Sequence, residues 1–129
     1  MSVNFKKENV VMSDFIVENG ELKNYTGSSE DVVVPEDVKI IGEDVFFRCK
    51  MKSIRLPSGL KKIKDGAFRA CNQLEEIDIP DNVTSIGRNA FCGSALARIK
   101  LPAKLTRIRE GSFQSTHCLL YTSRGGRRS

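Results

Sequence analysis

The amino-acid sequence predicts a repeat solenoid, a fold in which short coils of similar sequence stack on one another. The main observation is the spacing of the four prolines, which lie 22, 23 and 22 residues apart. An aliphatic residue follows each proline by three positions, an isoleucine by six and a phenylalanine by eleven. These residues are Pro35, Pro57, Pro80 and Pro102, then Val38, Leu60, Val83 and Leu105, then Ile41, Ile63, Ile86 and Ile108, then Phe46, Phe68, Phe91 and Phe113. Such a period in the twenties is typical of solenoids whose coils bury their apolar sides on their neighbours.

The repeated unit reads L-x-x-I-x-(L/I)-P-x-x-(L/V)-x-x-I-x-x-x-(A/V/S)-F. It resembles the BspA-like class of bacterial leucine-rich repeats, over residues 15–115. The resemblance implies a leucine-rich-repeat right-handed superhelix, built mostly of short parallel β-strands with tight turns or single helical turns. We therefore expect an N-terminal extension and β-hairpin cap over residues 1–31, about four coils of 22–23 residues over 32–116, and an irregular tail over 117–129.

The hairpin prediction comes from Asn19-Gly20, which lies between the β-prone runs 15–18 and 21–25. Asn-Gly tolerates the positive φ angles of a type I′ turn. The residues just before it, Met12-Ser13-Asp14-Phe15, are similar to the opening of the family's cap, so Met12 is a candidate start. A first coil has no neighbour on one side and needs a cover, which we expect the hairpin to provide.

Within each coil the sequence predicts two short strands separated by the proline. In the second coil, Ile54 and Leu56 alternate with Arg55, which directs the aliphatic side chains inward and the arginine outward. Pro57 lacks a backbone N–H donor and ends this strand. A weaker strand and a tight turn should follow and place the phenylalanine in the core. The glycines that recur once per coil are expected as turn residues; they are Gly42, Gly66, Gly87 and Gly111.

The outward positions of the first strand predict two columns of side chains across the coils. They are Val33, Arg55, Asp78 and Lys100, two residues before the prolines, and Asp31, Ser53, Glu76 and Arg98, four residues before. Opposite charges on neighbouring strands attract, so one interpretation is that these residues fix the strand register. The other is a binding strip, as the resemblance to leucine-rich repeats implies. Its candidate residues are Ser53, Arg55, Glu76, Asp78, Arg98 and Lys100.

The net charge of +5 raises the question of a polyanion partner, although a charge of +3 lies in residues 118–129 alone. Basic residues gather after the prolines, namely Lys39, Lys61, Lys62, Lys64, Arg107 and Arg109. A solvated face explains them, and weak polyanion binding is the alternative. Nucleic acid is not the expected partner, because Tyr25 and Tyr121 are the only tyrosines and no aromatic stacking platform alternates with the lysines.

The sequence predicts no catalytic, metal or cofactor site. His117 is the only histidine and lies where the repeat pattern fails, so it cannot be paired with a nucleophile on the regular frame. The four cysteines lack the C-x-x-C spacing of zinc sites. Cys49 and Cys71 share the fourteenth position after a proline. We expect core thiols there, a disulfide between them being the alternative.

The tail departs from the pattern at His117. Its CLLYTS is also the translation of TGTCTCTTATACACATCT, a transposon end used in preparing sequencing libraries. We interpret residues 117–129 either as such an artefact, with further natural coils replaced, or as a genuine and poorly ordered basic tail. A last coil without a cap should expose apolar side chains and an unpaired strand, which predicts self-association through that coil.

These patterns predict a non-enzymatic leucine-rich-repeat scaffold for protein–protein interaction or adhesion. The alternatives are a structural spacer within a longer surface protein and a weak polyanion binder that uses the post-proline lysines. No apolar run approaches the roughly 18 residues of a membrane span, and the N-terminus shows no secretory signal. A cytoplasmic location is therefore the default expectation, although the resembling family is often found at bacterial surfaces.

Overall fold

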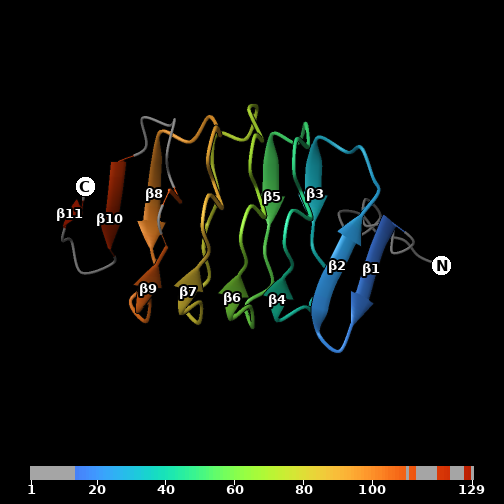
Figure 1. Ribbon diagram of the computed structural model, residues 1–129, viewed down its shortest axis with the longest axis horizontal. Helices are drawn as coiled ribbons and strands as arrows, with labels where there is room; N and C mark the ends of the chain where they lie inside the picture. Colours follow the sequence, from blue (N-terminus) through green and yellow to red (C-terminus); the bar gives the residue numbers. More distant parts are fainter. Residues whose placement is uncertain (1–13, 110, 113–118, 123–126, 129) are drawn as a thin grey trace.

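The computed structural model describes residues 14–109, 111–112, 119–122 and 127–128, and the backbone there winds into stacked coils (Figure 1). Among these residues the structure contains short strands, joined by turns and extended segments. The strands are β1 (Phe15–Glu18), β2 (Glu21–Tyr25), β3 (Asp31–Val33), β4 (Ile40–Ile41), β5 (Ser53–Arg55), β6 (Lys62–Ile63), β7 (Ser85–Ile86), β8 (Arg98–Leu101), β9 (Arg107–Ile108), β10 (Leu119–Thr122) and β11 (Arg127–Arg128).

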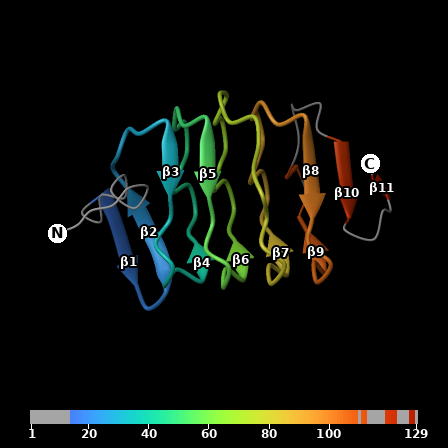
Figure 2. The same ribbon diagram turned by 180° about the vertical axis from the view of Figure 1, so that it is seen from behind.

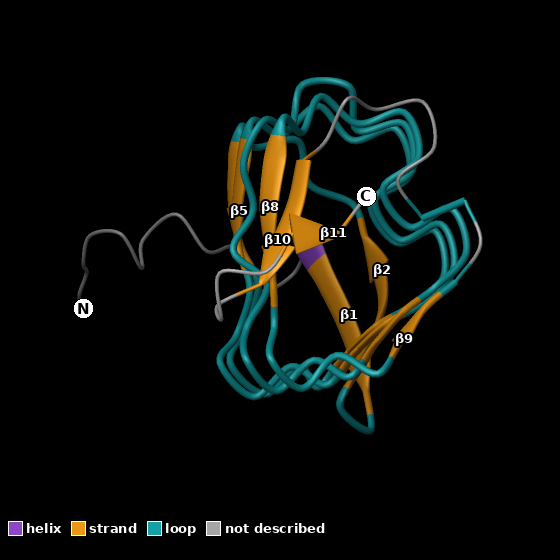
Figure 3. Ribbon diagram, turned by 90° about the vertical axis from the view of Figure 1, so that its left-hand side faces the viewer, coloured by secondary structure: helices purple, strands orange, loops and turns teal. Residues whose placement is uncertain are grey.

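The strands form three sheets, which lie on two sides of one apolar interior (Figure 3). The largest sheet has the order β1-β2-β4-β6-β7-β9 and contains the two hairpin strands followed by the strands that come after the prolines. On the side of the strands that precede the prolines, β3 pairs with β5, and β8 pairs with β10, which pairs in turn with β11. Apart from the two hairpin pairs, β1 with β2 and β10 with β11, every strand pair in the described residues is parallel. Parallel stacking of successive coils is the architecture that the repeat period predicts.

The N-terminal hairpin is confirmed. Asn19 and Gly20 both have positive φ angles, 51° and 80°, as a type I′ turn requires. Strand β2 then pairs in parallel with β4, so that Leu22 lies beside Ile41 and is fully buried. The hairpin therefore occupies the position of a preceding coil and covers the apolar edge of the first one.

The phenylalanine column forms a continuous aromatic ladder through the interior. Phe46, Phe68 and Phe91 are fully buried. The rings of Phe46 and Phe68 lie 5.2 Å apart and are nearly parallel, as are those of Phe68 and Phe91 at 5.1 Å. Tyr25 packs on Phe46 at 5.1 Å, and Phe15 packs on Tyr25 at 5.0 Å. The ladder thus extends from the coils into the cap.

The turn before each phenylalanine adopts a left-handed backbone conformation two residues upstream of it. The φ angles are 55° at Asp44, 68° at Gly66, 55° at Asn89 and 73° at Gly111. Asp, Asn and Gly adopt this conformation at low cost, which explains the residue types found there. The turns also stack, because the Phe68 N–H donates to the Ala90 carbonyl at 2.7 Å.

The remaining repeated glycines serve a different purpose from the one expected. Gly42 and Gly87 are not left-handed turn residues but points of close approach between coils. A Cβ at Gly42 would lie 2.5 Å from the Leu22 carbonyl oxygen, and one at Gly87 would lie 2.5 Å from the Asp65 backbone nitrogen. The expectation of one turn glycine per coil is therefore correct only for Gly66 and Gly111, which have positive φ angles. Gly42 and Gly87 occupy a different position of the repeat, where the backbones of adjacent coils come close together.

The tail contains more regular structure than expected. Strand β10 runs parallel to β8 in uninterrupted register, from Leu119 beside Arg98 to Thr122 beside Leu101. In Figure 2, β10 and β11 lie at the opposite end of the stack from the hairpin of β1 and β2. The expectation of an irregular tail is therefore wrong for β10 and β11, since β8 offers an open edge whose backbone groups β10 pairs with. The positions expected for Phe113 and His117 lie outside the described residues.

Candidate interaction surface

The outward side chains that precede the prolines define a surface that we call the strand face, formed by Ser53, Arg55, Glu76, Asp78, Arg98 and Lys100. Along this stretch of the coils the buried aliphatics Ile54, Ile77 and Ile99 alternate with the members of the strand face. Five of the six members are exposed, and the side chain of Arg98 is not described. The period-two alternation therefore directs the five described members outward, as predicted.

The register of the first two coils follows the predicted columns. In the pair β3–β5, Asp31 lies beside Ser53 and Val33 beside Arg55. The Ser53 hydroxyl donates a hydrogen bond of 2.6 Å to Asp31 Oδ1. A short hydrogen bond to a carboxylate thus joins these coils at the edge of the strand face.

In the third coil the predicted columns lose their backbone pairing. Glu76 and Asp78 lie outside any assigned strand, and the structure shows no ladder between this stretch and β5 or β8. The extra residue of the 23-residue unit lies between Cys71 and Leu74, directly before this stretch. The side chains of this stretch nevertheless keep their alternation, with Ile77 and Ile79 buried and Glu76 and Asp78 exposed.

The charged side chains of Arg55, Glu76, Asp78 and Lys100 are not used in ion pairs within the described part of the chain. The ion pairs found there join Lys23 and Lys64 to Glu21, and Lys52 to Glu30. The interpretation that alternating charges on these strands fix the register by ion pairing therefore finds no such pair in the described residues. Their side chains remain available to solvent or to a partner.

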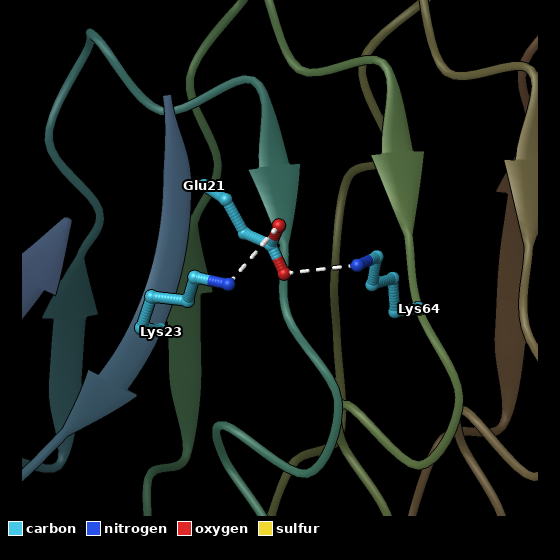
Figure 4. Close-up of polar contacts among 3 residues, drawn as sticks. All are labelled: Glu21, Lys23 and Lys64. Carbon is cyan, nitrogen blue, oxygen red and sulfur yellow. Dashed lines mark hydrogen bonds and ion pairs between the residues drawn. The ribbon is translucent and has the colours of Figure 1, made fainter. Parts of the chain in front are cut away.

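On the largest sheet, an ion pair links the cap to the second coil (Figure 4). Lys64 Nζ lies 3.0 Å from Glu21 Oε2, and Lys23 Nζ lies 3.6 Å from Glu21 Oε1. To reach Glu21, the Lys64 side chain crosses over the first coil near Gly42. A side chain at position 42 would crowd the ion pair, because its Cβ would lie 3.1 Å from Glu21 Oε2. Burial raises the pKa of the Glu21 carboxyl, but the hydrogen bond and charge of Lys64, together with Lys23, outweigh it and hold the pKa below its ordinary value.

An exposed aromatic residue escaped the sequence analysis. Phe47 follows the buried Phe46 and is 41% exposed. The guanidinium carbons of Arg48 and Arg69 lie 5.4 and 5.2 Å from its ring centre, within the range of cation–π contacts. The signal was present in the doubled Phe46-Phe47, because the offset of eleven residues from Pro35 assigns only Phe46 to the phenylalanine column.

Of the cysteines that the structure describes, Cys71 is buried, whereas Cys49 and Cys92 are only partly buried. Cys49, Cys71 and Cys92 are free, and the Cys71 thiol donates to the Phe46 carbonyl at 2.9 Å. Burial, with a smaller effect of Cys49, raises the pKa of Cys71 to about 12, and burial also raises the pKa of Cys49. A raised pKa disfavours the nucleophilic thiolate. Within the described residues no group of His, Cys, Asp and Glu side chains is placed to hold a metal ion.

The stacked parallel coils, the buried ladder and the outward strand face together define a leucine-rich-repeat protein. The chain belongs to the family described as "BspA type Leucine rich repeat region", whose model matches residues 17–123 in six copies. Six copies exceed the four coils that the prolines mark. The additional matched residues include β2 and β10, which pair in parallel with coil strands although their own segments contain no proline.

Solved structures of bacterial leucine-rich-repeat proteins share the fold. A leucine-rich repeat protein from Bacteroides ovatus superposes with a TM-score of 0.68 at 24% identity, over 86% of this chain and 32% of that one. The T. pallidum Leucine Rich Repeat protein superposes with a TM-score of 0.64 at 22% identity, over 81% of this chain and 66% of that one. A leucine rich cell surface protein from Faecalibacterium prausnitzii superposes with a TM-score of 0.60 at 22% identity, over 84% of this chain and 40% of that one. The chain thus spans about a third of the Bacteroides ovatus structure.

Among curated proteins, no significant match to this chain is found. In the described part of the chain no helix has the length and apolar character needed to cross a membrane.

Proposed function

We propose that the chain is a non-enzymatic scaffold that binds a protein partner through the strand face. The observation that carries the proposal is the state of its charged side chains. Arg55, Glu76, Asp78 and Lys100 are exposed and form no ion pair with a described residue. The buried aliphatics beneath them hold the backbone in place, so a partner meets charged side chains that project from fixed backbone positions.

The mixed signs on the strand face favour a protein partner over a simple polyanion. Two cations, Arg55 and Lys100, flank two carboxylates, Glu76 and Asp78, along the solenoid axis. Complementary charge patterns of this kind provide specificity and faster association more than raw affinity. Family membership agrees with this function, because leucine-rich repeats generally serve as interaction scaffolds.

The test is affinity capture with quantitative mass spectrometry, using the immobilised chain and extracts of the source organism and of its surroundings. The strand-face variant is Arg55→Glu/Lys100→Glu. The matched control is Lys50→Glu/Arg88→Glu, which reverses one lysine and one arginine that are exposed and lie outside the strand face. Both double variants change the net charge equally.

We expect a protein that the wild type and the control retain and the strand-face variant loses. Equal retention by all three chains would contradict the proposal. Failure of every chain to retain a protein specifically would favour the alternative of a structural spacer, which the similarity to a longer leucine rich cell surface protein also suggests.

A further inference from the structure

The largest sheet carries a hollow that the strand face does not involve. It has a volume of about 220 Å³ and lies over β7, whose coil provides Ser85, Ile86 and Gly87 as its floor. Lys62 and Lys64 line it from the preceding coil, and Arg107 and Arg109 line it from the following one.

The hollow follows from the register of the repeat. Lys62 pairs with Ser85, and Ser85 pairs with Arg107, in three neighbouring parallel strands. The middle coil therefore has a small residue where both neighbours have a long cation. Because adjacent strands lie about 4.8 Å apart, the two basic walls are separated by roughly 10 Å at the backbone.

Gly87 has no side chain to fill the hollow, and the packing of adjacent coils requires a glycine at this position. A Cβ there would lie 2.5 Å from both the backbone nitrogen and Oδ1 of Asp65. The same carboxylate accepts a hydrogen bond of 2.8 Å from the Arg88 N–H. A larger residue at position 87 is thus excluded by the contact between coils, and the depression is built into the stack.

The cations around the hollow exceed the acids that could neutralise them. Lys64 already pairs with Glu21, but Lys62, Arg107 and Arg109 form no ion pair with any residue in the described ranges. Of the two acids in the lining, Glu43 and Asp65, the latter is engaged with a backbone N–H. Three cations without an ion-pair partner in the described part of the chain therefore surround one hollow.

We propose that this hollow binds a tetrahedral oxyanion, the phosphate or sulfate group of a small ester. Arginine presents several N–H donors in a planar fork that matches such groups, and lysine adds a compact charge. The Ser85 hydroxyl adds a donor from the floor. The volume exceeds that of the oxyanion alone, so part of the carrier fits as well. This site lies on a different sheet from the strand face and does not depend on its function.

The test is a titration of the isotope-labelled chain, followed by NMR at constant ionic strength. Inorganic phosphate, inorganic sulfate and phenyl phosphate are the probes, and acetate is the carboxylate comparison. We expect saturable shifts at the amides of residues 85–87 and 107–109, with a Kd on the order of 1 mM or tighter. Tighter binding of phenyl phosphate than of inorganic phosphate identifies the ester as the preferred source, and the reverse order identifies the free ion.

The decisive variant is Ser85→Glu, which places a carboxylate between Lys62 and Arg107. Opposite charges on adjacent strands attract, so this variant should fold and melt no lower than the wild type. Its affinity for phosphate should nevertheless fall by about tenfold or more, because the carboxylate takes over the charge-assisted hydrogen bonds. Gln73→Glu, in an exposed turn outside the lining, adds the same charge and should leave the affinity unchanged.

Three results would overturn the proposal. They are non-saturating shifts spread over all basic residues, equal phosphate affinity in the wild type and the folded Ser85→Glu variant, and acetate binding as tight as phosphate binding. The first would indicate general charge screening, and the third would mean that the hollow selects charge without selecting the tetrahedral group.

Discussion

Phe68→Ala removes the central ring of the aromatic ladder. The ring is fully buried and stacks on Phe46 at 5.2 Å and on Phe91 at 5.1 Å. Truncating a buried phenylalanine to alanine costs about 3–5 kcal/mol. We expect the upper half of this range, because two aromatic contacts are lost and each contributes about 0.5–1.5 kcal/mol beyond its buried area. The free energy of unfolding of a folded domain is about 5–15 kcal/mol, so the loss is a large fraction of the total stability.

The assay is thermal and urea unfolding followed by circular dichroism. At roughly 2–8 °C for each kcal/mol, a loss of about 4 kcal/mol or more should lower the Tm by about 8 °C at the least. Because each coil is stabilised by its neighbours, the loss of stability should extend to the coils on both sides of Phe68. Amide exchange should accelerate at Phe46 and Phe68, whose N–H groups donate to Ala67 and Ala90 in the following coils.

Phe47→Ala is the matched control, since it makes the same substitution beside the ladder. Its ring is 41% exposed and contacts the guanidinium groups of Arg48 and Arg69. We expect a loss of about 1 kcal/mol, as for exposed cation–π contacts. If Phe68→Ala melts within about 2 °C of the wild type, or no lower than Phe47→Ala, the ladder does not hold the coils together.

Three further predictions concern the cap, a core thiol and the C-terminal end. Glu21→Gln should cost about 0.5–1 kcal/mol near neutral pH. Because the pKa of Glu21 is lowered, that difference should vanish as the pH falls below the ordinary carboxyl value of 4.5, and a constant difference in urea unfolding across the acid range would refute the role of the ion pair. The raised pKa of Cys71 means that the folded state favours the neutral thiol. The thiol's contribution to the free energy of unfolding is therefore complete below pH 9 and is lost as the pH rises toward about 12. The wild type should therefore lose stability relative to Cys71→Ala over this interval, and parallel pH profiles would show that Cys71 is not protected. Strand β9 forms an edge of the largest sheet in the described residues, so sedimentation velocity should show association that increases with concentration, whereas a monomer at every concentration would mean that this edge is covered.

The repeat made the interior predictable from the sequence. Because coils stack one-dimensionally, a position that recurs every 22 or 23 residues becomes a column, and the buried side chains of Leu60, Ile63 and Phe68 were each expected from their offset to the proline. The outward direction of the strand face followed equally from the period of two along a strand.

Contacts that depend on side-chain reach or on exact backbone alignment were not predictable. Lys64 and Glu21 are 43 residues apart, and their ion pair requires both the docked hairpin and the space at Gly42. The ladder reaches Phe15 and Tyr25 only because the cap continues the stack. The loss of strand pairing at residues 76–78 was not visible either, because Glu76 and Asp78 keep the same offsets to their proline as the corresponding residues of the paired coils.

The hollow over β7 was also hidden, although the sequence contained its basic residues. The sequence groups them after the prolines, but a solvated face is the simpler explanation of such a group. The distinguishing feature is the small Ser85 in register between Lys62 and Arg107, and that register is known only once the strands are paired.

The central claim, that the strand face recognises a protein, is tested most directly by photo-crosslinking. A photoreactive residue is placed at position 55 on the strand face and, in a second chain, at position 88 outside it. Both positions are exposed arginines that form no ion pair within the described residues. The account predicts that the protein retained in the capture experiment is crosslinked from position 55 and not from position 88. Crosslinking from position 88 alone, or equally from both, would contradict it.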